Sequence, residues 1–177
     1  MSVESGNVYC PTRLIVVMGA TGCGKSTIGE GLSQRLSAAY LEGDDFHSAK
    51  NKEKMAAGIA LSDDDRWPWL ESLSDAMRNC NGKAVTSCSS LKRSYRDFIT
   101  ASAGEPVLFV HLHGSKELLM SRLSKRQGHF MNVNLLDSQL ETLEPTESDE
   151  LSFTVDINAA VKDIISNIET TILTSRI

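Results

Sequence analysis

Leu14-Ile15-Val16-Val17-Met18-Gly19-Ala20-Thr21-Gly22-Cys23-Gly24-Lys25-Ser26 joins an apolar run to a glycine-rich turn. The apolar part has no polar residue, which is typical of a strand buried on both faces of a parallel sheet. After the turn, apolar residues recur every four positions (Ile28, Leu32, Leu36), as in an amphipathic helix that begins near Lys25. A strand, a glycine-rich loop and a helix in this order predict the start of an α/β fold.

The glycine-rich turn matches the pattern G-x-x-x-x-G-K-[ST] at every fixed position. Its glycines let backbone N–H groups point at phosphate oxygens, and the following helix adds its positive end. Lys25 would neutralise the β- and γ-phosphates, and Ser26 would offer Mg²⁺ a hydroxyl ligand. The flanking strand and helix favour ATP or GTP binding over a chance glycine-rich turn. The predicted nucleotide-binding residues are Gly19, Ala20, Thr21, Gly22, Cys23, Gly24, Lys25, Ser26 and Thr27.

Signatures of the GTP-dependent switches are missing from the sequence. Neither D-x-x-G nor N-K-x-D occurs, and Asn51-Lys52-Glu53-Lys54 lacks the aspartate of the second pattern. After the third or fourth predicted strand, no apolar strand ends in the aspartate expected of a Walker B ligand. These features favour a small phosphotransferase over a motor or a signalling NTPase.

Composition and length predict one domain over residues 1–177. Hydrophobic residues make up 41% of the chain and charged residues 23%, enough for a single core. A net charge of −5 does not favour nucleic-acid binding. No run approaches the roughly 18 apolar residues of a membrane helix, and residues 1–11 lack a signal-peptide core, so we expect an intracellular protein. The four cysteines show neither zinc nor disulfide spacing.

Further apolar runs predict four more strands, which extend the first into a five-stranded parallel sheet. They cover residues 39–42, 84–88, 107–112 and 151–155. Ser62 is expected to cap a helix whose first turn carries three aspartates, where the helix dipole favours negative charge. Another helix is expected from about Leu91, and Glu144–Glu150 is interpreted as an acidic surface loop.

Acidic residues follow the second predicted strand, at the edge where α/β proteins bind ligands. The stretch is Glu42-Gly43-Asp44-Asp45-Phe46-His47. Asp44 is the predicted acid that accepts a proton from an attacking hydroxyl and helps to hold Mg²⁺ through water. Alternation places Glu42 on the same side as Asp44. The alternative is an acidic turn that only caps the next helix.

Two groups of cations follow from spacing along predicted helices. Lys92 and Arg96 lie four residues apart, and with Arg66 they would form a pocket for an anion, since arginine suits a carboxylate. Arg122 and Arg126, also four apart, would lie on a lid and stabilise transition-state charge while excluding water. For Arg66, Lys92 or Arg96 taken alone, a solvated surface charge is the favoured interpretation.

His111 and His113 alternate onto one face of the fourth strand. No third metal ligand accompanies them in the sequence, so packing at the strand end is preferred over a metal site.

Read in order, these blocks resemble the small gluconokinase family, from about Leu14 to Val155. Besides the phosphate loop, the resemblance rests on Gly43–His47, Leu61–Leu70, Cys88–Asp97, Arg126–Phe130 and Glu141–Glu144. It implies ATP-dependent phosphorylation of the 6-hydroxyl of D-gluconate, which gives 6-phosphogluconate for the pentose phosphate pathway. It also implies a three-layer P-loop kinase fold, a helical lid at about residues 122–142, and a homodimer.

The resemblance also implies roles for individual residues. Transfer would depend on Lys25, Asp44, Arg122 and Arg126. The residues implied to line the gluconate pocket are Asp44, His47, Arg66, Lys92, Arg96 and His129.

The sequence departs from relatives at Cys23, commonly Ser, and at Ser90, commonly Ala. A helix N-terminus near Cys23 would lower the pKa of its thiol and make it prone to oxidation. The alternative is a small residue that only fills the turn.

Two other functions stay open at this point: a kinase of shikimate or a nucleoside monophosphate, and a non-catalytic ATP-binding module. The presence of both an acid for the hydroxyl and cations for the phosphates disfavours the module. Ser175-Arg176-Ile177 resembles an address for peroxisome- or glycosome-type organelles, with the cytoplasm as the alternative.

Overall fold

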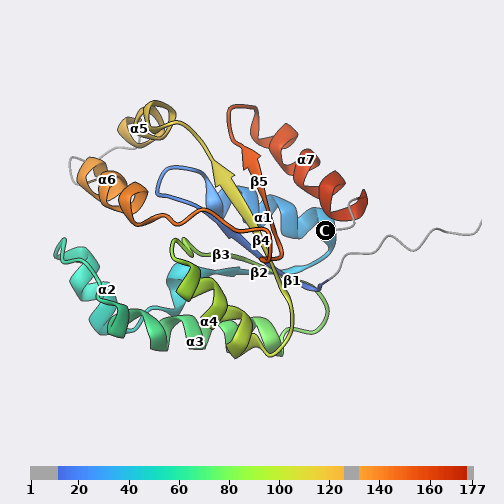
Figure 1. Cartoon of the computed structure of the whole chain (residues 1–177), viewed down its shortest axis with the longest axis horizontal. Helices are drawn as coiled ribbons and strands as arrows, with labels where there is room; N and C mark the ends of the chain where they lie inside the picture. Colours follow the sequence, from blue (N-terminus) through green and yellow to red (C-terminus); the bar gives the residue numbers. More distant parts are fainter. Residues whose placement is uncertain (1–11, 126–131, 175–177) are drawn as a thin grey trace, which may run out of the picture.

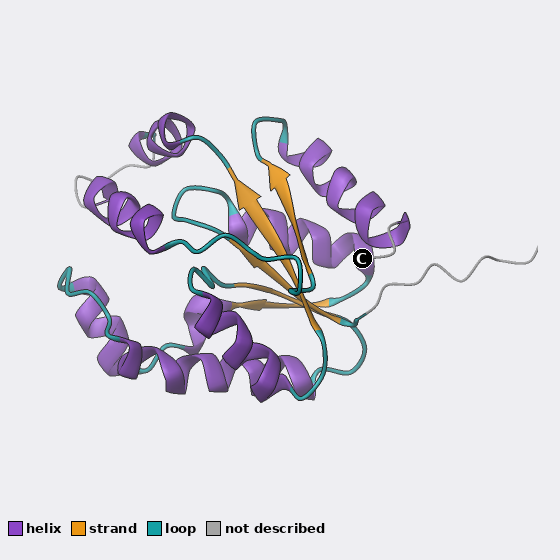
Figure 2. Ribbon diagram, viewed as in Figure 1, coloured by secondary structure: helices purple, strands orange, loops and turns teal. Residues whose placement is uncertain are grey.

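The structure is a computed structural model that describes residues 12–125 and 132–174. Its five strands are all parallel and form one sheet in the order β2-β3-β1-β4-β5 (Figures 1 and 2). The strands are β1 (Leu14–Met18), β2 (Ala39–Glu42), β3 (Ala84–Ser87), β4 (Val107–His113) and β5 (Ser152–Asp156). The predicted five-stranded parallel sheet is therefore confirmed, with differences only at strand ends.

The first strand lies in the middle of the sheet, as its uninterrupted apolar sequence indicates. All five of its residues are completely buried, because β3 and β4 flank it and helices cover both faces. Its side chains alternate between two cores: Ile15 and Val17 belong to one, and Leu14, Val16 and Met18 to the other. This burial on both sides explains why the strand shows no polar alternation.

Helices cover the two faces of the sheet and complete a three-layer fold (Figure 2). On one face lie α1 (Lys25–Leu36) and α7 (Val161–Thr174), which pack on each other. On the other lie α3 (Asp63–Asn79) and α4 (Arg93–Ala103). The expected three-layer α/β architecture is confirmed.

Short elements surround the carboxyl edge of the sheet, at the left of Figure 1. They are η1 (Gly43–Phe46), α2 (Ala49–Ala56), α5 (Lys116–Ser124) and α6 (Asn132–Thr142). The helices α5 and α6 pack on each other and overlap the expected lid. Residues 126–131 of that lid lie outside the described residues.

Two helix starts test the sequence interpretation. Ser62 caps α3 as expected, in a capping box in which Asp65 also bonds back to the Ser62 backbone. The helix expected from about Leu91 instead begins at Arg93. The delay has a local cause, because Lys92 has an extended backbone (φ −95°, ψ 147°) and serves as the N-cap of α4.

Across residues 12–125 and 132–174, no helix combines the length and the apolar character that a membrane span requires.

Candidate active site

The loop between β1 and α1 has the backbone that its glycines allow. Gly19 has a φ of 140°, and a Cβ on it would lie 2.7 Å from the carbonyl oxygen of Leu112, so a side chain there would clash. Gly24 is also left-handed (φ 94°) and ends the loop one residue before α1. The predicted strand–loop–helix unit is therefore present, and the helix N-terminus faces the loop.

The basic side chains near this loop fold over it. Lys25 Nζ donates to the carbonyl oxygen of Ala20 at 3.1 Å, across the loop that it closes. Arg122, on α5, donates to the carbonyl oxygens of Cys23 at 3.4 Å and Ile157 at 2.8 Å. Two of the four predicted catalytic residues thus lie at the phosphate loop, where both cations can neutralise phosphate charge.

A glutamine of α6 also contacts the phosphate loop, and the sequence analysis missed it. Gln139 Oε1 accepts a hydrogen bond from the backbone N–H of Thr21 at 2.7 Å. The two residues are far apart in the sequence, and no motif marks Gln139. Its contact shows that α6 reaches the loop directly.

Cys23 does not have the environment expected of a reactive thiol. Its side chain is buried, and its sulfur lies 2.9 Å from the position that a Cβ on Gly19 would take. Burial raises the pKa of the Cys23 thiol above its usual value, although Lys25 and Arg122 act in the opposite direction. The expectation of a lowered pKa at Cys23 is wrong, because desolvation outweighs the helix end and the nearby cations.

The turn after β2 places Asp44 at the surface of the carboxyl edge. Gly43 lets this turn lie against β3, because a Cβ there would fall 1.9 Å from the carbonyl oxygen of Ser87. The side chain of Asp44 is 83% exposed, and its Oδ1 lies 3.9 Å from Nε2 of His47. An exposed carboxylate at this edge can reach a bound small molecule.

The ring of His47, next to Asp44, is fixed by contacts with Trp69 and Asn51. Its ring stacks on Trp69 with centroids 3.9 Å apart, and its Nδ1 lies 3.4 Å from the amide nitrogen of Asn51. Burial lowers the pKa of His47 below its ordinary value, while Asp44 opposes that shift. His47 therefore presents a largely neutral imidazole at neutral pH.

Glu42 lies beside the phosphate loop at the end of β2. Its carboxylate accepts hydrogen bonds from the hydroxyls of Tyr40 and Ser87, and Ser26 adds a third. Burial alone would raise the pKa of Glu42, but the hydrogen bonds lower it below its ordinary value. The same burial and the adjacent Glu42 raise the pKa of Tyr40 to about 12. Glu42 thus stays ionised next to Ser26. From the sequence, Asp44 was the carboxylate expected to help Ser26 to hold Mg²⁺, through water.

Arg66 and Lys92 meet around Asp63, at the start of α3. Arg66 Nη1 and Lys92 Nζ each lie 3.2 Å from its carboxylate, and the hydroxyl of Tyr95 donates to it. Tyr95 in turn accepts from Arg66 at 3.1 Å. The predicted pairing of these two cations is therefore seen, with Asp63 and Tyr95 as partners that the sequence analysis did not identify.

Arg96 is not part of this group. Its side chain is completely buried and forms an ion pair with Glu150. The expectation failed because Lys92 is the N-cap of α4 with an extended backbone (φ −95°, ψ 147°), so it does not share a helical face with Arg96. Glu150, with a side chain 5% exposed, corrects the interpretation of Glu144–Glu150 as only a surface loop.

The remaining predicted site residues are less informative. Arg126 and His129 lie outside the described residues. His111 is buried at the end of β4, its ring centroid 6.0 Å from that of His113. Burial, with His113 and Arg96, lowers the pKa of His111 to about 4. Over residues 12–125 and 132–174, no cluster of three or more His, Cys, Asp or Glu side chains could hold a metal.

Comparison with known proteins places this arrangement in a family. Residues 15–156 match a family model described as an AAA domain. A probable gluconokinase of Dictyostelium discoideum is 46% identical over 168 residues, which cover 88% of this chain and 84% of that protein. The thermosensitive gluconokinase of Escherichia coli (strain K12) is 43% identical, covering 91% of this chain and 88% of that protein.

Solved structures agree with this placement. A crystal structure of a gluconokinase from Sinorhizobium meliloti 1021 has a TM-score of 0.83 and 42% identity, with 90% of each chain covered. The Mycobacterium tuberculosis APS kinase CysC, at a TM-score of 0.67 and 18% identity, shares the fold, with 92% of this chain and 98% of that chain covered. The gluconokinases described above are 42% to 46% identical over most of both chains, which shows that this chain belongs to the gluconokinase family.

Proposed function

We propose that this protein transfers the γ-phosphoryl group of ATP to the 6-hydroxyl of D-gluconate, giving 6-phospho-D-gluconate and ADP. Besides the membership of the gluconokinase family, one structural observation supports this proposal. The phosphate loop with Lys25, the exposed carboxylate of Asp44 and the pair Arg66 and Lys92 all belong to segments that meet at the carboxyl edge of one parallel sheet. A phosphate donor and a small anionic alcohol would therefore meet at that edge.

Phosphoryl transfer depends on positioning and on charge stabilisation more than on covalent chemistry. The loop N–H groups and the N-terminus of α1 would hold the phosphates. Lys25 and Arg122, whose cationic groups both lie at the loop, would stabilise charge on the transferring group. Arg126 remains a proposed second lid cation.

Asp44 is proposed as the residue that takes the proton of the 6-hydroxyl. Its carboxylate is exposed, and within residues 12–125 and 132–174 its ionic partner is His47, at 3.9 Å. His47 cannot turn freely, because it is stacked on Trp69 and lies next to Asn51. We propose that His47 orients Asp44 and borders the acceptor pocket, and that His129 covers it.

Recognition of gluconate would rest on its carboxylate. Arg66 and Lys92 lie around a single carboxylate, that of Asp63, and each also lies about 5.5 Å or less from the ring centre of Tyr95. Two cations that share one acid leave a net positive site, which suits a ligand carboxylate. Arg96 would contribute indirectly, through its hydrogen bonds to the backbone just before Lys92.

The donor set at Ser26 suits Mg²⁺. A hydroxyl and the ionised carboxylate of Glu42 are hard oxygen ligands, and Mg²⁺ commonly binds through few protein ligands, with water and phosphates as the others. When bound, Mg²⁺ would neutralise charge on the phosphates. Ser26 would hold it directly, and Glu42 and Asp44 are proposed to act through water.

The proposal is tested by ADP release from purified protein with Mg·ATP and one acceptor at a time. D-gluconate is expected to stimulate release strongly, while shikimate and AMP leave it at the rate without acceptor. Stimulation by shikimate or AMP instead would retain the kinase chemistry and overturn the substrate. ATP binding without release for any acceptor would favour the non-catalytic module.

Two expectations from the resemblance and the C-terminal sequence also belong to this proposal. A homodimer predicts about twice the chain mass of 19.3 kDa in sedimentation. Import into a peroxisome- or glycosome-type organelle through Ser175-Arg176-Ile177 predicts that deletion of these residues returns a tagged protein to the cytoplasm. These three residues lie outside the described part of the chain.

A further inference from the structure

Arg96 carries a permanent charge in the interior of the protein. Its guanidinium donates hydrogen bonds to both carboxylate oxygens of Glu150, from Nε and from Nη2. The side chains are 0% and 5% exposed. A buried ion pair is costly to desolvate unless its other donors are satisfied, so the partners of those donors reveal what the arrangement holds in place.

The other donors of Arg96 reach backbone carbonyls in two separate segments. Nη1 donates to Ser90 at 3.1 Å and to Leu91 at 3.3 Å, in the loop between β3 and α4. It also lies 3.2 Å from the carbonyl of Glu144, and Nη2 lies 3.4 Å from that of Pro145. One side chain therefore joins the loop after β3 to the segment that leaves α6.

The first of these segments leads directly to Lys92. Its backbone is unusual, because Ser90 adopts a left-handed conformation (φ 45°) that a residue with a side chain rarely takes and that surrounding contacts must hold. On its other side, the carbonyl of Ser89 accepts a hydrogen bond from the N–H of Gly19 at 3.3 Å. The loop thus spans the distance between the phosphate loop and the cation that is proposed to bind gluconate.

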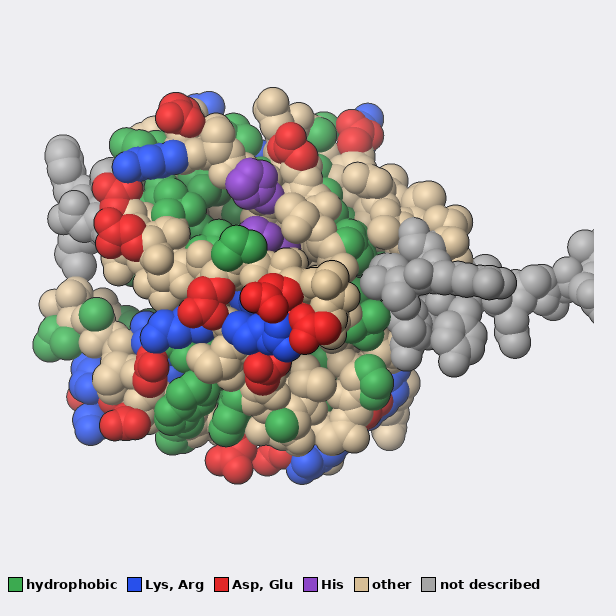
Figure 3. Space-filling view, in the orientation of Figure 1, with side chains coloured by type: hydrophobic (Ala, Val, Ile, Leu, Met, Phe, Trp, Pro, Cys, Tyr) green, Lys and Arg blue, Asp and Glu red, His purple; other side chains and the backbone are tan. Residues whose placement is uncertain are grey.

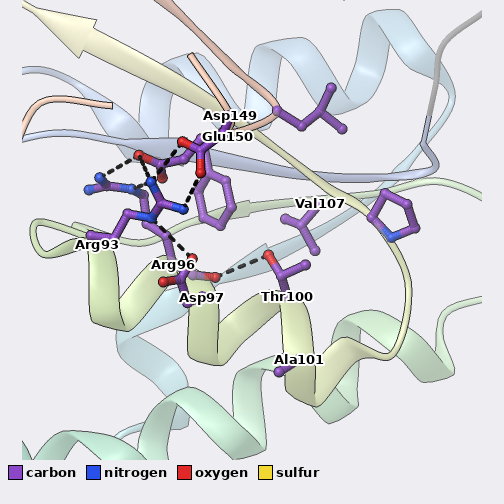
Figure 4. Close-up of a pocket in the computed structure, with 11 residues that line it drawn as sticks. Arg93, Arg96, Asp97, Thr100, Ala101, Val107, Asp149 and Glu150 are labelled. Atoms are coloured by element: carbon purple, nitrogen blue, oxygen red, sulfur yellow. Dashed lines mark hydrogen bonds and ion pairs between the residues drawn. The ribbon is translucent and has the colours of Figure 1, made fainter. Parts of the chain in front are cut away.

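The second segment is attached to the same loop by its own backbone. The N–H of Glu144 donates to the carbonyl of Leu91 at 2.8 Å, and the carboxylate of Glu144 accepts from the N–H of Arg93. Figure 4 shows Arg96 and Arg93 reaching from α4 toward Glu150 and Asp149 of this segment. Loss of the Arg96 contacts would therefore loosen both segments at the base of the acceptor pocket.

We infer that Arg96, held by Glu150, is a positioning residue for the acceptor pocket. It fixes the backbone on which Lys92 stands, and so sets the distance of Lys92 from Arg66 and from the phosphate loop. Arg96 itself does not touch the substrate. This inference rests on the proposed function and deepens it, because it predicts an effect on D-gluconate and not on ATP.

Arg93 provides a matched control on the same helix. Its side chain pairs with Glu147 at 3.1 Å and Asp149 at 2.8 Å and lies 4.0 Å from Glu150, but it is 32% exposed and reaches no carbonyl of the described loop after β3. Basic and acidic side chains lie next to one another across the middle of the face in Figure 3, as expected of such solvated pairs. Exposed pairs of this kind contribute little to stability.

The experiment compares Arg96→Lys with Arg93→Lys by steady-state kinetics with Mg·ATP. A lysine at position 96 keeps the charge but cannot bind Glu150 and the carbonyls together, so we expect the KM for D-gluconate to rise about tenfold. The KM for ATP is expected to stay within about twofold. Arg93→Lys is expected to leave both constants within about twofold of the wild type.

A second variant, Glu150→Gln, keeps the shape of the pair and removes one charge. It is expected to raise the KM for D-gluconate several-fold, again without a change for ATP. It decides the question if Arg96→Lys does not fold. An unchanged KM for D-gluconate in every folded variant, or equal changes for both substrates, would overturn the inference while the activity of the wild type upheld the proposed function. A wild-type protein inactive with D-gluconate would overturn both.

Discussion

The backbone N–H of Thr21 donates a hydrogen bond to the side chain of Gln139 at 2.7 Å, which links the phosphate loop to α6. The contact is partly buried, so its loss leaves a donor without a partner. We expect Gln139→Leu to lower the free energy of unfolding by about 1 kcal/mol in the absence of nucleotide. Urea denaturation measures this difference, with Ser138→Ala at an exposed neighbour as the control. Equal stability of the two variants would contradict it.

Lys25→Ala is expected to reduce turnover by about a hundredfold or more, because it removes a cation from the phosphates. Stability should change little, since among the described residues the Lys25 side chain makes one hydrogen bond, to Ala20. Initial rates and thermal unfolding measured on the same preparation separate the two effects. Lys52→Ala, which removes an exposed lysine bound to the carbonyl of Asp45, should retain normal turnover. Near-normal turnover in Lys25→Ala would argue against phosphoryl transfer at this loop.

Asp44→Asn is expected to bind ATP as the wild type does and to lose most of the transfer. The amide keeps the size of the side chain but cannot take the proton from the hydroxyl. Equilibrium nucleotide binding and gluconate-dependent ADP release distinguish these steps. Asp45→Asn, at the adjacent position of η1, is the control. A loss of ATP binding in Asp44→Asn would instead place this carboxylate in the nucleotide site.

His111 predicts a dependence of stability on pH. Its pKa is about 4 in the folded protein, against an ordinary value of 6.5, so the unfolded chain binds more protons between these values. The contribution of neutral His111 to the free energy of unfolding is therefore fully present above about pH 6.5, and it falls as the pH is lowered toward 4. Between pH 7.5 and pH 5 this residue should account for about 2 kcal/mol of the loss. The loss in His111→Gln should be smaller by that amount, as measured by urea unfolding at both pH values.

Cys23 is expected to react slowly with thiol reagents in the native protein. Burial raises its thiol pKa and shields the sulfur, so little thiolate is available. Cys80 is less buried and should react faster. Cys23→Ser should therefore leave the fast phase of thiol labelling unchanged. The sensitivity of the protein to oxidants should also be unchanged in this variant. The disappearance of a fast phase in this variant would restore the redox hypothesis.

Local patterns in the sequence predicted the parts of the fold that depend on neighbouring residues. The strand–loop–helix unit at Leu14–Leu36 and the Ser62 cap follow from apolar spacing and from hydrogen bonds within a few positions. The start of α4 was displaced because Lys92 has an extended backbone and caps the helix, which no local pattern indicates.

Contacts between distant segments could not be predicted in the same way. Glu150 belongs to an acidic run that is typical of a solvated loop. It lies 54 residues from Arg96 along the sequence, and it becomes a buried partner because the fold brings the two side chains together. Gln139 and Glu42 likewise acquire their roles from the phosphate loop that they touch. Spacing paired Lys92 with Arg96, and it could not show that Asp63 instead brings Lys92 together with Arg66.

The identity of the product decides whether this protein phosphorylates the 6-hydroxyl of D-gluconate. Purified protein is incubated with Mg·ATP and D-gluconate, and the product is examined by phosphorus and carbon NMR. A phosphate monoester on the oxygen of carbon 6 and an equal amount of ADP are expected, with far less of both from Lys25→Ala in the same time. A phosphate at another position, or ADP released without a phosphorylated gluconate, would contradict the proposed function.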